Sequence, residues 1–178
     1  LHPHEDELPI VLCPDGSILR NPSIEALARC VGLLRPFDAH RRYDVAIVGA
    51  GPAGLATAVY AASEGLSVLV LDSRAFGGQA GASARIENYL GFPTGISGMA
   101  LMARAYNQAR KFGADMAIPC EIVQLDCRPD PDAGGFRLAL ASGEHVDARV
   151  IVVASGARYR RLDVPNLADF EGASVHYS

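Results

Sequence analysis

The chain has 178 residues, of which 49% are hydrophobic and 20% charged, and a formal net charge of −4 at pH 7. This length suffices for one sizeable core and a small appendage. Because no basic run accompanies the acidic balance, neither nucleic acid nor an anionic membrane is expected as a partner. Without a membrane-length apolar run or a signal-peptide pattern, we expect a soluble, cytoplasmic protein. The first residue is leucine, so we expect the chain to begin inside a longer protein.

The opening part of the chain predicts a small β-hairpin followed by a helix. Short apolar stretches at 9–13 and 17–19 flank Pro14-Asp15-Gly16, which indicates a hairpin around an Asp-Gly turn. Ser23 then provides the N-cap of an amphipathic helix predicted over residues 24–34.

These first elements bury too little surface to fold alone. We therefore interpret residues 1–34 as the tail of a truncated domain and residues 35–42 as a linker. The order of a proline, a hairpin and a final helix resembles the last third of a thioredoxin fold, with Pro9 at the cis-proline position. A generic hairpin and helix is an equally good interpretation, because X-Pro bonds are usually trans.

The most informative motif is a glycine-rich turn that follows a short β-branched strand at 43–48. The three glycines have separate roles. Gly49 allows a sharp turn, Gly51 allows the backbone to approach a pyrophosphate, and Gly54 allows the next helix to pack closely on the strand. The amides that begin this helix, predicted over 55–62, then face the pyrophosphate. The motif predicts a dinucleotide site.

A lone glycine motif is weak evidence, so its context decides. A second apolar strand at 67–71 ends in Asp72, 23 residues beyond Gly49, where a ribose-binding carboxylate is expected. Such an acid accepts hydrogen bonds from ribose hydroxyls and repels a 2′-phosphate, so the site is predicted to take FAD or NAD rather than NADP. The alternative is a strand-end aspartate that caps the next turn.

Two further stretches of small residues predict close approach of the backbone to a ligand. Residues 75–82 are too small and glycine-rich for a core element, and Gln79 among them could reach that ligand. Residues 154–157 are small in the same way. Between the two stretches, Ser97 caps a long amphipathic helix predicted to run through Phe112.

From Cys120 to Asp147 the hydrophobic period changes to two. Strands at 121–125, 136–140 and 145–147 predict a three-stranded antiparallel meander, and a buried parallel strand follows at 150–153. The whole pattern predicts an α/β fold, with a Rossmann-like parallel sheet and a meander crossover.

The four cysteines show neither a Cys-x-x-Cys pair nor metal-ligand spacing; they are Cys13, Cys30, Cys120 and Cys127. We therefore expect reduced, mostly structural thiols and no metal site. The histidines are scattered, and no catalytic residue is assigned from spacing.

Residues 43–178 resemble the thioredoxin reductase branch of the two-dinucleotide flavoprotein family. The signatures that carry the resemblance are the Gly-x-Gly-Pro-Ala-Gly turn, Gly77-Gly78-Gln79, Ile86-Glu87-Asn88 with Gly91-Phe92-Pro93, the helix ending Gln108-Ala109-x-x-Phe112-Gly113-Ala114, and Ala154-Ser155-Gly156-Ala157. The resemblance implies that residues 43–178 form the first part of an FAD-binding domain. The NAD(P)H domain and the rest of the FAD domain would follow the chain end.

The resemblance also implies the residues of the cofactor site. Those for the FAD pyrophosphate are Gly49, Gly51, Pro52, Ala53 and Gly54. For the rest of FAD, the resemblance implies that Asp72 binds the adenosine ribose and that the backbone near Ile122 contacts adenine. Gly78, Gln79 and Asn88 would lie at the flavin end. Ala154, Ser155 and Gly156 correspond to the family's Ala-Thr-Gly turn, in which serine keeps the hydroxyl.

By the same resemblance the protein is an FAD-dependent oxidoreductase and a homodimer. Hydride would pass from NADPH or NADH to the flavin, and electrons onward to a thioredoxin-like, ferredoxin-like or disulfide acceptor. This chain, carrying only part of the FAD domain, is not expected to turn over alone.

One position departs from the family pattern. Ungapped alignment places Ser178 where thioredoxin reductases have the first cysteine of the redox Cys-x-x-Cys, and serine cannot form that disulfide. Three interpretations stay open: a ferredoxin–NADP reductase-like or fused flavoenzyme without the dithiol, a disulfide reductase with its dithiol elsewhere, and a regulatory module that binds FAD or NAD without catalysis.

Overall fold

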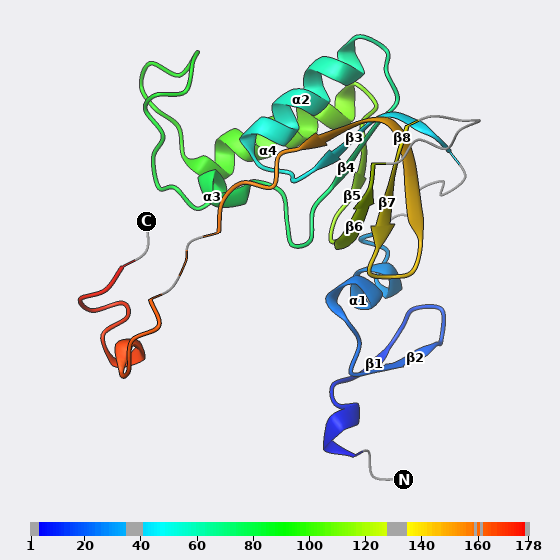
Figure 1. Cartoon of the computed structure of the whole chain (residues 1–178), viewed down its shortest axis with the longest axis vertical. Helices are drawn as coiled ribbons and strands as arrows, with labels where there is room; N and C mark the ends of the chain where they lie inside the picture. The colour runs from blue at the N-terminus through cyan, green and yellow to red at the C-terminus, as the bar shows by residue number, and fades with distance from the viewer. Residues whose placement is uncertain (1–3, 35–40, 128–134, 159, 161, 177–178) are drawn as a thin grey trace.

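A six-stranded mixed sheet forms the centre of the structure (Figure 1). The computed structural model describes residues 4–34, 41–127, 135–158, 160 and 162–176. The strands are β3 (Tyr43–Val48), β4 (Val68–Leu71), β5 (Asp115–Ala117), β6 (Ile122–Asp126), β7 (Phe136–Leu140) and β8 (His145–Val153), in the spatial order β5-β4-β3-β8-β7-β6. Pairing is parallel from β5 to β8 and antiparallel from β8 to β6. The predicted α/β fold with a parallel sheet and a meander is confirmed.

Strand β8 joins two elements that the sequence predicts separately. Its first residues pair antiparallel with β7, and from Ala148 onward it pairs in parallel with β3. Ala148 pairs with both Phe136 and Tyr43, so the chain passes from one neighbour to the other without a break. The prediction of two strands was wrong because a polar interruption in the pattern marks a change of partner here, not an end of the strand. The short β5 was not predicted.

Two helices cover one face of the parallel strands, α2 (Pro52–Ser63) and α4 (Gly98–Lys111) (Figure 1). α2 begins three residues earlier than predicted, with Pro52 at its first turn, where the proline costs no hydrogen bond. The predicted cap of α4 is confirmed, since the Ser97 side chain accepts a hydrogen bond from the Ala100 amide. The core on this face contains Val45, Ile47, Ala58, Ala62, Val68, Val70, Ala109 and Ala114.

The opposite face of the sheet is covered partly by the N-terminal segment. Ala28 and Leu34 are buried in one cluster with Tyr43, Ala46, Leu69, Leu71, Cys120, Leu138, Leu140, Val146 and Ala148. Alternate residues of β3 and β4 thus enter opposite cores, so these strands are buried on both faces.

The N-terminal segment consists of η1 (Glu5–Glu7), β1 (Ile10–Leu12), β2 (Ile18–Arg20) and α1 (Ile24–Cys30). The predicted hairpin and the Ser23 cap are confirmed, since β1 pairs antiparallel with β2 and Ser23 Oγ accepts from the Ala26 amide. α1 ends four residues earlier than predicted, just before Gly32 takes a left-handed conformation. The Leu8–Pro9 bond is cis. Assignment to a thioredoxin-like domain stays a prediction, as do the domain boundaries; residues 35–40 of the linker lie outside the described residues.

Cys13 and Cys30 form a disulfide, with Cα atoms 5.5 Å apart. The expectation of four reduced thiols was therefore wrong for this pair. The two cysteines are 17 positions apart in the sequence, a spacing that matches no motif; the hairpin and α1 bring them together. Cys120 and Cys127 are free, the first buried and the second exposed.

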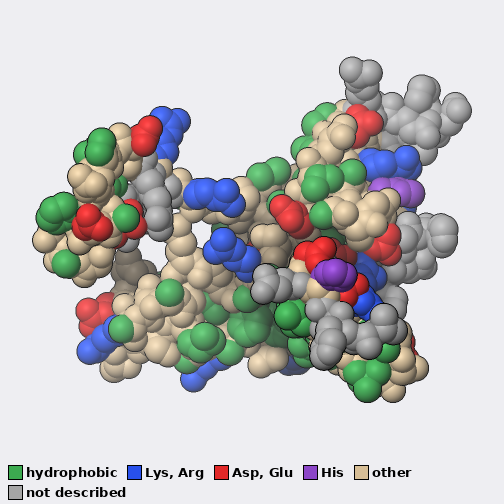
Figure 2. Space-filling model, turned by 90° about the horizontal axis from the view of Figure 1, so that it is seen from below, with side chains coloured by type: hydrophobic (Ala, Val, Ile, Leu, Met, Phe, Trp, Pro, Cys, Tyr) green, Lys and Arg blue, Asp and Glu red, His purple; other side chains and the backbone are tan. Residues whose placement is uncertain are grey.

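The surface carries charge of both signs. In Figure 2, Lys and Arg side chains are scattered among acidic ones and do not gather in a single patch. No helix in the described part of the chain is both long and apolar enough to cross a membrane. After β8 the chain continues to a short 3-10 helix, η2 (Leu167–Asp169).

Candidate functional site

Three segments meet at the carboxyl edge of the parallel strands. The Gly49 amide donates to the Leu71 carbonyl at 2.7 Å, which joins the glycine turn to the end of β4. The Ala154 amide donates to the Val48 carbonyl at 2.8 Å, which joins the end of β8 to the end of β3. This edge, between strand ends and a helix start, is the usual ligand position of open α/β sheets.

Gly49 and Gly54 have no room for a side chain. Gly49 has φ +111°, and a Cβ there would lie 2.3 Å from the Ala154 carbonyl oxygen. A Cβ on Gly54 would lie 1.9 Å from the Gly49 carbonyl oxygen. The predicted roles of these glycines, a sharp turn and close packing of helix on strand, are confirmed.

Gly51 differs from the other two, because the space beside it is open. A Cβ there would meet only Gly78 Cα, at 3.9 Å. Gly51 is the N-cap of α2 and supplies no side-chain cap to the amides of its first turn, where Pro52 and Ala53 lie. Uncapped amides at a helix start are suited to phosphate oxygens. The turn therefore fits the pyrophosphate of a dinucleotide, although the binding role of its residues stays a prediction.

Gly78 faces the glycine turn from α3 (Gly78–Gly81). The stretch 75–82, predicted to be no core element, contains this four-residue helix, which has no buried residue. The Gly77 amide donates to the Ala50 carbonyl at 2.8 Å and fixes α3 against the turn. Gly77 was not among the site residues predicted from the sequence. Its φ of +110° is a left-handed conformation that favours glycine, and the consecutive glycines Gly77 and Gly78 were the sequence feature that could have indicated it.

Gln79 connects α3 to the turn after β8. Its side-chain Nε2 donates to the Ala157 carbonyl at 2.8 Å. The same turn contains the partly exposed Ala154 and the exposed Ser155 and Gly156. The structure therefore brings both predicted small-residue stretches together beside Gly49.

Asp72 lies at the end of β4 and bonds to the glycine turn. Its Oδ2 accepts from the Ala50 amide at 2.9 Å, and its Oδ1 accepts from the Arg74 amide at 2.9 Å. The hydrogen bond from the Arg74 amide shows that Asp72 caps the turn after β4, which was the alternative to a ribose-binding role. Because each carboxylate oxygen has a further lone pair, these bonds leave acceptor capacity for ribose hydroxyls. The ribose role of Asp72 stays a prediction.

Asn88 and Ile122 lie outside this convergence. Asn88 is exposed on the loop closed by the bridge between Ile86 and Ile96. Ile122 begins β6 and packs against the core. The backbone before Ile122 adjoins β4, because the Cys120 amide donates to the Asp72 carbonyl at 2.7 Å.

Cys120 is buried at this point, and burial raises the pKa of its thiol from 9.0 to about 12. We predict that iodoacetamide at pH 8 alkylates the exposed Cys127 and leaves Cys120 unmodified until the chain is unfolded. An unfolded Cys120 would ionise near its ordinary pKa, so its contribution to stability is lost as pH rises from about 9 toward 12. Mass spectrometry after timed labelling checks this; rapid modification of Cys120 in the folded chain would contradict it.

Residues 43–178 match the family model described as pyridine nucleotide-disulphide oxidoreductase. The chain belongs to this family. It is 35% identical to the thioredoxin reductase of Bacillus subtilis (strain 168), over 76% of this chain and 40% of that protein. It is 38% identical to the thioredoxin reductase of Treponema pallidum (strain Nichols), over 76% of this chain and 42% of that protein.

Solved structures agree with these relatives. The thioredoxin reductase of T. acidophilum is similar at a TM-score of 0.65 and 32% identity, over 74% of this chain and 41% of that one. The atypical thioredoxin reductase of Desulfovibrio vulgaris Hildenborough is similar at a TM-score of 0.58 and 37% identity, over 74% of this chain and 42% of that one. The resemblance to thioredoxin reductases is confirmed. The chain spans about two fifths of the length of these relatives.

Proposed function

We propose that this chain binds FAD as the first part of the FAD domain of a thioredoxin-reductase-like flavoprotein. The observation that carries the proposal is the open space beside Gly51 at the uncapped start of α2, in a turn whose other two glycines, Gly49 and Gly54, admit no side chain. Gly49 to Gly54 bind the pyrophosphate, and Asp72 binds the adenosine ribose.

The remaining predicted residues complete the site. Gly78, Gln79 and Asn88 lie at the flavin end, the backbone near Ile122 at adenine, and Ala154, Ser155 and Gly156 beside the turn. Bound FAD supplies hydride acceptance from NADPH or NADH; the residues of this chain bind and orient it. The described residues offer no group to which we assign a proton transfer.

The electron acceptor of the whole protein is a thioredoxin-like or ferredoxin-like protein. Serine occupies position 178, which ungapped alignment places at the first cysteine of the redox motif, and this favours the type without the dithiol. Ser178 lies outside the described residues. The whole protein is a cytoplasmic homodimer. A regulatory module that binds FAD or NAD without catalysis is the second candidate, since no catalytic residue is assigned.

A visible spectrum of the parent protein tests the proposal. We expect a flavin absorbance band that NADPH or NADH bleaches anaerobically, and bleaching by one of them alone identifies the donor. A colourless protein that takes up no added FAD would refute the proposal. A coloured protein that neither nicotinamide bleaches favours the regulatory module.

A further inference from the structure

A cavity of about 440 Å³ lies between α1 and the chain segments that follow β4, β5 and β7. α1 contributes Ser23, Ile24, Glu25, Ala26 and Arg29 to its lining, and the sheet side contributes Ser73, Pro119, Cys120, Glu121, Ala141 and Ser142. The α1 side precedes residues 43–178 and so lies outside the part that matches the family model. The cavity therefore lies between the family domain and a segment that precedes it.

The cavity begins one residue beyond the predicted ribose carboxylate. Two of its lining residues adjoin Asp72. Ser73 follows Asp72 in the chain, and the Cys120 amide donates a hydrogen bond to the Asp72 carbonyl. A base attached to a ribose at Asp72 is within reach of this cavity.

The lining has the chemistry that an adenine ring needs. Ile24, Ala26 and Pro119 supply apolar wall for the faces of a flat ring. The Ser73 hydroxyl can donate to a ring nitrogen, and the Glu121 carboxylate can accept from the exocyclic amine.

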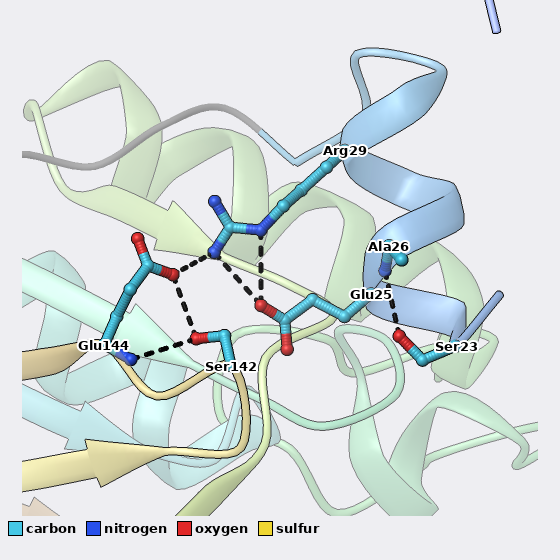
Figure 3. A network of polar contacts seen from close by, with 6 residues as sticks. All are labelled: Ser23, Glu25, Ala26, Arg29, Ser142 and Glu144. Carbon is cyan, nitrogen blue, oxygen red and sulfur yellow. Dashed lines mark hydrogen bonds and ion pairs between the residues drawn. The ribbon is translucent and has the colours of Figure 1, made fainter. Parts of the chain in front are cut away.

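Polar contacts hold α1 in place over the cavity (Figure 3). The Arg29 guanidinium bonds to Glu25 one turn earlier, at 3.0 Å, and to Glu144 in the turn between β7 and β8. Ser142 Oγ donates to the Glu144 carboxylate at 2.9 Å. Burial of Ala28 in the sheet core adds an apolar anchor, so this wall of the cavity is fixed.

We propose that α1 forms the outer wall of the adenine pocket, so that a segment preceding the family domain takes part in binding the cofactor. This inference rests on the proposed FAD function. Ala26, half-buried and facing the cavity, is the residue that reports on it. Leu27, the next residue on α1, is 37% exposed and does not line the cavity.

Protection of a new thiol tests the inference on the 178-residue chain. We expect saturating ADP or FAD to slow maleimide labelling of Ala26→Cys at least about fivefold, and to leave labelling of Leu27→Cys unchanged. Peptide mass spectrometry separates each site from Cys127. Equal labelling of Ala26→Cys with and without nucleotide would overturn the inference.

Affinity provides an independent measurement. Titration calorimetry should show ADP binding at least about tenfold weaker in Ala26→Trp, and within about twofold of wild type in Leu27→Trp, with thermal melts confirming that both fold. Wild-type chain that binds FAD, with both tryptophan variants unaffected, overturns this inference alone. Wild-type chain that binds neither FAD nor ADP overturns the proposed function as well.

Discussion

Gly51→Val is expected to abolish FAD retention while leaving the chain folded. Gly51 has φ −78° and ψ −173°, an extended conformation that valine adopts without strain. A Cβ there touches only Gly78 Cα, at an ordinary 3.9 Å, so the valine side chain occupies the space we assign to the pyrophosphate. Loss of two charge-assisted hydrogen bonds, roughly 3 kcal/mol, corresponds to about a 100-fold weaker affinity for FAD.

Flavin absorbance per protein and a thermal melt measure the two parts of this prediction. Valine is a poorer N-cap than glycine, so we expect a stability loss of no more than about 1 kcal/mol. Ser63→Val, at the other end of α2 and exposed, is the matched control and should keep wild-type flavin content. Normal flavin content in Gly51→Val would refute the assignment of the turn to the pyrophosphate.

Local sequence signals predicted the parts of this protein in which neighbours along the chain decide the structure. The glycine turn and the strand before it require only a short apolar run and three glycines, and both form where predicted. The cap of α4 by Ser97 is equally local, because a side chain three residues away satisfies one amide.

Features that depend on distant partners escaped prediction. The pairing of Cys13 with Cys30 follows from how the hairpin returns to α1. β8 is continuous because Ala148 pairs with both β3 and β7, and no residue near Ala148 in the sequence indicates this double pairing. The contact of α1 with the turn at Glu144 spans 115 residues, so sequence analysis could define α1 as a helix and not as a wall of the candidate site.

Gly54→Ala is expected to destabilise the fold itself. The added Cβ would lie 1.9 Å from the Gly49 carbonyl oxygen and 3.0 Å from its carbon, both backbone atoms that no rotamer change can move. Relief requires α2 to move away from β3, which would disturb the burial of Leu55 and Ala58. Overpacking of this kind costs about 3 kcal/mol or more, a large part of the free energy of unfolding of a small domain.

Urea unfolding of Gly54→Ala measures this loss, expected as a lower midpoint with an unchanged slope. Gly81→Ala is the matched control, because Gly81 is also helical but its added Cβ would meet only Met102 Cγ, at an ordinary 3.9 Å. That control should be neutral or more stable by about 0.5 kcal/mol, since alanine reduces the entropy of the unfolded chain. Gly51→Val and Gly54→Ala lie three residues apart in one turn, yet the first should lose the ligand and the second the fold. A wild-type midpoint in Gly54→Ala would mean that α2 does not pack on β3 as closely as this turn requires.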